Sequence, residues 1–241
     1  INKLDIKFFV KGSFIAILSN DEFLVSKHLD TVKNAIKWKS IKDLSNKDIF
    51  TSIVENEKES LLVKDGGEAT FESIPDLKTF DRFPNYRTKT ITFKKSYLMH
   101  GSIGPSAACA IFENNKYKIY THSQGIYDLK LTISKALKTS QENVNLKYSP
   151  GSGCYGHNGA DDVAFEAAFI AKAFPDNHIL LKWTREDEHC WEPYGSASIN
   201  KLSSTINEKG KIIYWSHEVF SDTYMTRPSD NELYNFISYK L

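Results

Sequence analysis

The stretch Gly151-Ser152-Gly153-Cys154-Tyr155-Gly156-His157-Asn158-Gly159 shapes every interpretation of this chain. It follows an alternating strand pattern at residues 144–148 and precedes an alanine-rich segment predicted to be helical from about Ala160 to Phe174, before Pro175. Glycines at such a junction let successive backbone N–H groups turn toward one point. The helix start adds about half a positive charge there. The stretch therefore predicts a cradle for a phosphate or pyrophosphate.

The same glycines also fit Gly-x-Gly-x-x-Gly, the fingerprint of nicotinamide-dinucleotide-binding folds. Two features count against that interpretation. The preceding strand alternates polar and apolar residues, whereas a central Rossmann strand is nearly all apolar. The acidic residue expected ~20 positions further on is missing, because Glu186 and Asp187 lie too far along. A structural loop that binds nothing is a third interpretation, and the loop alone leaves all three open.

Asp161 and Asp162 follow the loop in the first turn of the predicted helix. Asn158 with Asp161 resembles a capping box, and carboxylates favour a helix start. The two carboxylates would nevertheless repel a phosphate placed directly on that terminus. The conflict is resolved if the phosphate lies on the loop amides while the carboxylates face donor groups, such as those of a pterin ring. The alternative is that both are simple helix-start residues.

The remaining patterns predict an α+β fold with mixed sheets. A hairpin is predicted from strands 107–112 and 117–121, and the following helix has Leu129, Ile133 and Leu137 on its inner face. Alternation predicts a half-buried strand at residues 91–94. Further strands are predicted at residues 179–183 and at residues 199–205 and 211–220, the last two as an antiparallel pair.

Two domains are expected. Residues 1–88 predict a small α/β domain, with a strand at 12–18, a helix capped by Asn20 with Phe23, Val32 and Ile36 on its apolar face, and a helix from Ser45 to Glu57. Residues 89–241 predict part of a larger mixed-sheet domain.

Composition excludes several classes of function. The 241 residues include 31 Lys and Arg against 30 Asp and Glu, mixed along the chain, which gives no electrostatic footprint for nucleic acid. No apolar run approaches the ~20 residues of a membrane span, so a soluble chain is expected, on either the cytoplasmic or the periplasmic side. Cys109, Cys154 and Cys190 are widely spaced, which argues against a disulfide framework and against a zinc or iron–sulfur cage.

Residues Gly151 to Asp162, read with Val163-Ala164-Phe165-Glu166-Ala167-Ala168, resemble the molybdopterin-binding large subunit of the xanthine dehydrogenase/aldehyde oxidase family. The likeness is greatest to the branch of the isoquinoline 1-oxidoreductase beta subunit and the nicotinate dehydrogenase large subunit. Three further blocks agree in order and spacing: residues 99–106, residues 121–125, and residues 183–188 followed by 191–195. The resemblance covers roughly residues 90 to 228, and residues 1–88 match the family's small hammerhead domain more loosely.

The resemblance implies a cofactor-binding role for residues of two blocks. Gln124 matches a glutamine that reaches an oxo ligand of the molybdenum, and Gly151 to His157 match a loop whose backbone lies against the metal and the pterin. Cys154 and Tyr155 replace a phenylalanine and a glycine of the xanthine oxidase branch, which puts the substrate in doubt. The expected cofactor-binding residues are Gln124, Gly125, Gly151, Ser152, Gly153, Cys154, Tyr155, Gly156, His157, Asn158, Asp161 and Asp162.

Other reactive residue types in the matched blocks have plainer expectations. Cys154 is expected to be a small buried filler, and His157 is either a hydrogen-bond donor to the cofactor or structural. Residues 185–188 are expected to be a solvated charged turn, with a catalytic role for Glu186 or Glu188 as the less favoured alternative. Core or interface anchors are expected at Trp183, Trp191 and Tyr194.

The implied activity is that of a molybdenum hydroxylase, which hydroxylates an N-heteroaromatic or aldehyde carbon with water as the oxygen source. The implied cofactor is molybdenum–molybdopterin cytosine dinucleotide, whose metal is held by the pterin dithiolene and by no protein side chain. The implied [2Fe-2S] clusters are carried by a small iron–sulfur partner subunit.

The family's base is a glutamate near the end of a much longer subunit. The catalytic residue is therefore expected beyond this chain, with the remainder of its own large subunit as a partner. We expect this chain alone to be inactive and to hold molybdopterin weakly. The alternatives are a nicotinamide-dependent oxidoreductase and a non-enzymatic α+β binding domain.

Overall fold

The structure is a computed structural model that describes residues 6–39, 48–55, 62–63, 67, 69–70, 85–222 and 227–228. It contains two compact units, and the chain alternates between them. The first comprises residues 1–44, 99–194 and 225–241, and the second comprises residues 45–98 and 195–224. The α+β class is confirmed. The two units are defined by how the chain packs, and neither is continuous in sequence. They therefore do not test the predicted domain boundary at residue 88, which stays a prediction.

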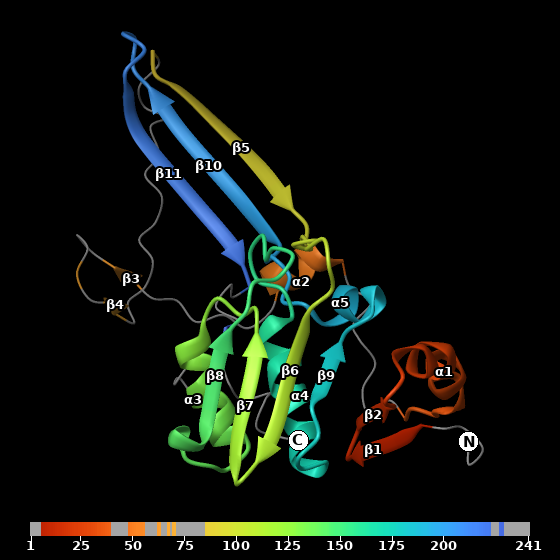
Figure 1. Cartoon of the computed structure of the whole chain (residues 1–241). Coiled ribbons are helices and arrows are strands. Elements are labelled where there is room, and N and C mark those ends of the chain that lie inside the picture. The colour runs from red at the N-terminus through yellow and green to blue at the C-terminus, as the bar shows by residue number, and fades with distance from the viewer. Residues whose placement is uncertain are drawn as a thin grey trace. The chain divides into compact units, whose positions relative to one another are not determined.

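The first unit is built on a four-stranded mixed sheet of order β8-β7-β6-β9 (Figure 1). Its strands are β6 (Ala107–Glu113), β7 (Lys116–Thr121), β8 (Val144–Tyr148) and β9 (Ile179–Lys182). Strands β7 and β8 are parallel, whereas β6 runs antiparallel to both β7 and β9. The helices of this part are α3 (Ile126–Ala136), the short 3₁₀ turn η1 (Gln141–Asn143), α4 (Ala160–Ala173) and α5 (Arg185–Trp191).

Local sequence explains this core directly. Asn114 and Asn115 turn the β6–β7 hairpin with φ of 50° and 59°, which asparagine tolerates better than most residues. Leu129, Ile133 and Leu137 are buried as predicted. Helix α4 is rich in fully buried alanines, whose small side chains let it pack closely on β6, β7 and β9.

The N-terminal segment belongs to the same unit. Strands β1 (Lys7–Lys11) and β2 (Phe14–Leu18) form an antiparallel pair, and α1 (Glu22–Ala35) follows. Asp21, not Asn20, caps α1, by accepting from the Phe23 amide at 2.9 Å. Phe23 is 67% exposed, so its expected place on a buried face is wrong, whereas Val32 is buried.

The second unit contains a three-stranded antiparallel sheet of order β11-β10-β5. Its strands are β5 (Arg87–Lys95), β10 (Ser198–Ile206) and β11 (Ile212–Ser221); the unit also holds α2 (Ile49–Glu55) and the short pair β3 (Leu62–Val63) and β4 (Ala69–Thr70). The predicted β10–β11 pairing is confirmed. Residues 45–47 and 56–57 of the expected second helix lie outside the described residues.

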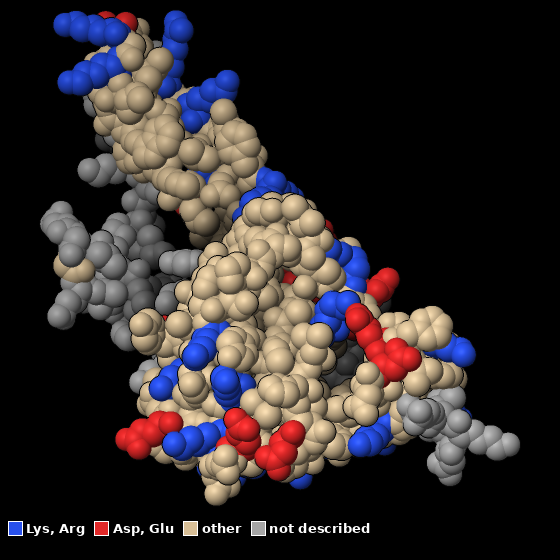
Figure 2. Space-filling model, in the orientation of Figure 1, with Lys and Arg blue, Asp and Glu red and all other residues tan. Residues whose placement is uncertain are grey.

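The expectation of a half-buried strand at residues 91–94 is wrong, because β5 is exposed along its whole length. An alternating sequence indicates that the two faces of a strand differ in polarity. It does not indicate whether other residues cover either face. The register places Phe93 and Val219 on either side of Asn200, on one face, and their side chains are exposed. Figure 2 shows Lys and Arg side chains gathered at the end of this sheet where β10 turns into β11.

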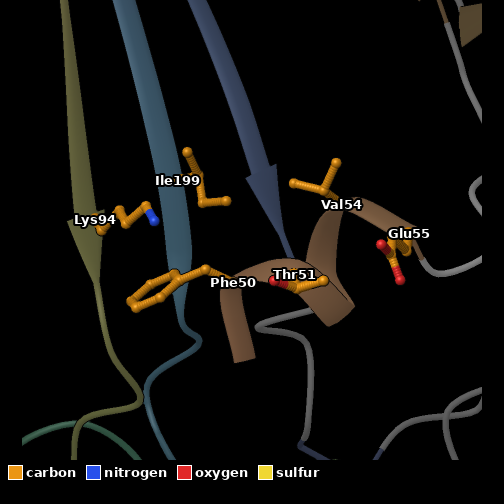
Figure 3. A pocket seen from close by; sticks show the side chains of 6 residues that line it. All are labelled: Phe50, Thr51, Val54, Glu55, Lys94 and Ile199. Atoms are coloured by element: carbon orange, nitrogen blue, oxygen red, sulfur yellow. The ribbon is translucent and has the colours of Figure 1, made fainter. Parts of the chain in front are cut away.

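A shallow hollow of about 300 Å³ lies in the second unit between α2 and the strands β5 and β10 (Figure 3). The Lys94 ammonium lies 5.0 Å from the centre of the Phe50 ring there. The lining residues are Phe50, Thr51, Val54, Glu55, Lys94 and Ile199. None of them is a predicted site residue, so the hollow is separate in sequence from the cofactor-binding blocks.

Candidate cofactor site

Three loops converge at one end of the four-stranded sheet. The parallel strands β7 and β8 both end there, and the antiparallel β6 begins there. The Ser149 amide donates to the Thr121 carbonyl at 2.8 Å, and the Thr121 hydroxyl donates to the Ala160 carbonyl at 3.0 Å. The topology thus brings residues 99–106, 122–125 and 149–159 together.

The glycine-rich loop follows β8 and opens α4 at Ala160, as predicted. The expected Asn158–Asp161 capping box is absent, because Gly159 is the N-cap residue and has no side chain to bond. Asn158 Oδ1 accepts from the Ala160 amide at 3.3 Å, and its Nδ2 donates to the Gly153 carbonyl at 3.2 Å. Asn158 therefore fastens the loop to itself.

The start of α4 is not an open anion site. Glu188 Oε1 accepts from the Gly159 amide at 3.1 Å, while Asn158 takes the Ala160 amide. The helix start was expected to contribute to a phosphate cradle. That expectation is wrong for the Gly159 and Ala160 amides, because both are already bonded within the protein. Within the part of the chain that the structure describes, the amides of Ser152 to Gly156 make no hydrogen bond. The loop amides are the donors left for a ligand.

Gln124 lies beside the glycine loop, so the two blocks that are expected to bind the cofactor are close together. One nitrogen of Arg227, Nη2, donates to Gln124 Oε1 at 3.2 Å and to the Gly156 carbonyl at 3.1 Å. A Cβ placed on Gly151 would lie 2.7 Å from His122 Cγ, so the two loops touch at a second point. Sequence reasoning missed Arg227, which belongs to no quoted motif.

Asp161 is buried beneath the loop and already engaged by protein groups. Ser123 Oγ donates to its Oδ1 in a short hydrogen bond, and His157 Nε2 lies 3.0 Å from its Oδ2. Arg227 Nη1 lies 3.6 Å from the same Oδ2. The geometry thus gives His157 a structural partner, and direct contacts of Asp161 and His157 with a pterin stay predictions.

Asp162 differs from Asp161 because its residue reaches the surface. Its pKa is raised to about 7, first because the surrounding protein displaces water and then because Asp161 and Glu166 are negative. A carboxyl that is more easily protonated repels less an oxyanion bound by the neighbouring loop amides.

The other expected site residues have mixed surroundings. Cys154 is buried, as expected, and its thiol donates to the Gly156 carbonyl at 3.0 Å. Tyr155 is 61% exposed at φ 53°. Ser152 Oγ accepts from the Gly104 amide at 2.8 Å, and Gly125 caps α3.

Residues 185–188 are not a solvated turn. They open helix α5, whose start is held by a capping box between Thr184 and Asp187. Glu188 is fully buried and accepts from the Ser106 amide at 2.7 Å, the Ser106 hydroxyl at 3.0 Å and the Gly159 amide. The sequence could not show this burial, because a run of charges has no apolar period. Glu188 thus ties two loops to α5.

The two tryptophans that were expected to be core or interface anchors differ in burial. Trp183 belongs to the core and donates from Nε1 to Glu166 Oε2 at 2.9 Å, whereas Trp191 is 71% exposed.

His122 Nε2 accepts from the Ala107 amide at 3.2 Å, which places the imidazole proton on Nδ1. Burial lowers the His122 pKa, against the opposing charges of Glu188 and Asp161, in agreement with a neutral acceptor.

Glu166 provides a pH-dependent test of this packing. Burial raises its pKa to about 7, the Trp183 hydrogen bond opposes the rise, and Asp187 adds to it. Because the folded-state value exceeds the unfolded one, stability is lost as pH rises from about 4.5 through 7. Glu166→Gln keeps the acceptor for Trp183 and removes the titration. We compare the free energy of unfolding of the variant with that of the parent at each pH, measured by urea unfolding. This difference should shift by about 1–2 kcal/mol in favour of the variant from pH 5 to pH 8. An unchanged difference between the two pH values would contradict the raised pKa.

The molybdopterin cofactor-binding domain family matches residues 78–235. This chain belongs to that family. The match confirms the resemblance to the xanthine dehydrogenase/aldehyde oxidase group. Among the described residues, no helix is long and apolar enough to cross a membrane, and no group of three or more His, Cys, Asp or Glu could hold a metal ion.

Two curated proteins are similar to parts of this chain. A nicotinate dehydrogenase chain of Pseudomonas putida is 31% identical over 116 residues, which are 48% of this chain and 10% of that protein. A membrane-bound aldehyde dehydrogenase [pyrroloquinoline-quinone] of Gluconacetobacter polyoxogenes is 21% identical over 146 residues, 57% of this chain and 19% of that protein. The match thus spans a tenth to a fifth of each curated relative.

A solved structure supports the fold. Quinoline 2-oxidoreductase from Pseudomonas putida 86 superposes with a TM-score of 0.50 at 9% identity, over 55% of this chain and 17% of that one. At such low identity the likeness concerns the fold alone.

Proposed function

We propose that this chain supplies cofactor-facing loops to a molybdenum hydroxylase that acts on N-heteroaromatic or aldehyde carbons. The observation that carries the proposal is the Arg227 guanidinium, which joins Gln124 to Gly156 beneath a loop of unbonded amides. With Oε1 held by Arg227, the Nε2 donor of Gln124 is left to face an oxo group. Five neighbouring amide donors suit the oxygens of a phosphate or a metal-oxo group.

The bound molybdenum cofactor would supply the redox chemistry and activate water. The chain's own groups would bind and orient it: the amides of Ser152 to Gly156 as donors, and Gln124 as a second donor fixed by Arg227. No described residue is assigned as the catalytic base. The same proposal includes the cytosine dinucleotide form, a small subunit with [2Fe-2S] clusters, a contribution from the remainder of a large subunit, and a hammerhead-like domain over residues 1–88.

The nicotinamide alternative is not favoured by the fold. Strand β8, which precedes the glycine loop, lies at the edge of a mixed sheet and is parallel only to β7. Dinucleotide folds place that strand inside a parallel sheet. No specific observation favours a purely structural binding domain.

The proposal is tested by producing the chain in a host that makes the cofactor and in a matched strain that does not. We expect substoichiometric pterin, detected by fluorescence after oxidation, only from the first host. Gly156→Val should abolish it, because a side chain at φ 146° would meet the His100 ring. Gly210→Asn, in the β10–β11 turn of the second unit, is the control. Equal amounts of pterin in the two variants would overturn the assignment of the cofactor site. Stoichiometric molybdenum with turnover of nicotinate, isoquinoline or aldehydes would overturn the expectation that this chain alone is inactive.

A further inference from the structure

The second buried carboxylate of α5 is incompletely bonded, unlike Glu188. Glu192 caps the C-terminal end of the helix, and its side chain is fully buried. Its Oε1 accepts from the His100 amide at 2.6 Å, but its Oε2 has no partner among the described residues. Helix carbonyl ends disfavour negative charge. A buried carboxylate in this position therefore needs a positive neighbour.

His100 is that neighbour. Its Nδ1 is buried, has no hydrogen-bond partner within the described part of the chain, and lies 3.8 Å from Glu192 Oε1. Buried polar atoms that lack a hydrogen-bond partner destabilise the folded state. A small rotation of the ring would let Nδ1–H donate to the carboxylate and satisfy both groups.

The opposite edge of the His100 ring lies against the glycine loop. A Cβ built on Gly156 would be 2.0 Å from His100 Cδ2 and 2.4 Å from Nε2, so only glycine admits the ring there. His100 Nε2 therefore lies beside Gly156, the last residue in the run of unbonded amides.

We propose that His100, as an imidazolium held by Glu192, donates Nε2–H to an oxyanion bound by the amides of Ser152 to Gly156. Glu192 is then a positioning residue that acts through His100. The inference rests on the proposed function, because it assigns the loop's ligand chemistry. That oxyanion chemistry could belong to a phosphate group or to a molybdenum-oxo group.

The other charges around the loop are already engaged. Arg227 lies between Gln124, Gly156 and Asp161, and His157 pairs with Asp161. Arg185 donates to the carbonyls of Ser102 and Ile103. Glu192 is the charged partner at His100 itself. Asp162 at the start of α4 also titrates between pH 6 and pH 8, because its pKa is raised to about 7. The part of the pH dependence that is lost in His100→Gln therefore reports on His100.

The test titrates the chain with molybdate and, separately, with inorganic pyrophosphate at pH 6 and pH 8, followed by ¹⁵N amide shifts of residues 152–156 and ¹⁵N shifts of the histidine rings. We expect binding to be several-fold tighter at pH 6, where histidine ordinarily gains its proton. His100→Gln should weaken it about tenfold at pH 6 and remove the extra pH dependence. Glu192→Gln should act similarly, with partial recovery in Glu192→Asp.

His178→Gln is the matched control, since His178 is exposed beside Ile179, at the other end of β9 from Lys182 and the loops. Comparing variants at one pH cancels the titration of pyrophosphate itself, and the stronger of the two anions identifies the source of the oxyanion. Loop amides that respond equally in the parent and in His100→Gln would overturn the inference while leaving the cofactor site standing. An absence of any loop response to either anion would also overturn it, whereas the pterin measurement tests the proposed function separately. If His100→Gln does not fold, the ¹⁵N shifts of the His100 ring during the titration of the parent protein test the inference without the variant.

Discussion

Glu188→Ala is expected to lower the free energy of unfolding by about 3–5 kcal/mol, a large share of a typical domain's stability. The substitution removes a fully buried carboxylate and strands three donors, the Ser106 amide, the Ser106 hydroxyl and the Gly159 amide. Glu188→Gln should recover only part of the loss, because Oε1 can still serve two donors while Nε2 would face the Ser106 N–H. Urea unfolding measures both variants.

Glu186→Ala on the same helix is the control. Glu186 is exposed, and its lowered pKa comes from its own amide first and from Thr184 second. We expect little change in stability on its removal. Similar losses for the two alanine variants would mean that helix composition, and not the buried hydrogen bonds of Glu188, sets the effect.

Gly159→Ala should have the second-largest effect, a loss of about 2–3 kcal/mol. The backbone at Gly159 has an ordinary φ of −74°, so the cost is one of space. A Cβ there would lie 2.1 Å from Cζ3 of the buried Trp183 ring, and overpacking of a dense core typically costs about 1–3 kcal/mol. The indole cannot retreat freely, because its Nε1 is bonded to Glu166.

Gly125→Ala provides the comparison, because Gly125 caps α3 as Gly159 caps α4. Among the residues that the structure describes, a Cβ at Gly125 would meet Arg227 alone, at 4.0 Å. Both variants share the loss of a glycine cap, so their difference isolates the clash with Trp183. Trp183→Leu should rescue Gly159→Ala in a double-mutant cycle, and additive losses would argue against the steric explanation.

Much of the first unit was predictable because its signals are local. The hairpin around Asn114 and Asn115 follows from residues that tolerate positive φ, and α4 follows from an alanine-rich segment between a glycine and a proline. The loop positions followed from the order of strands and helices. Gln124 could be placed near the glycine loop because adjacent parallel strands end at the same edge of a sheet.

The sequence by itself determined the family, the strands and helices on either side of the glycine loop, and the blocks that form the candidate site. Only the tertiary structure decided that Glu188 is buried while Glu186 is exposed, that Arg227 links Gln124 to Gly156, and that β5 is uncovered. The reason is physical: burial of a charge depends on donors from distant segments, and Ser106 lies 82 positions from Glu188. Periodicity reports which residues share a face, but the partners that satisfy or cover that face are chosen by the packing of the whole chain.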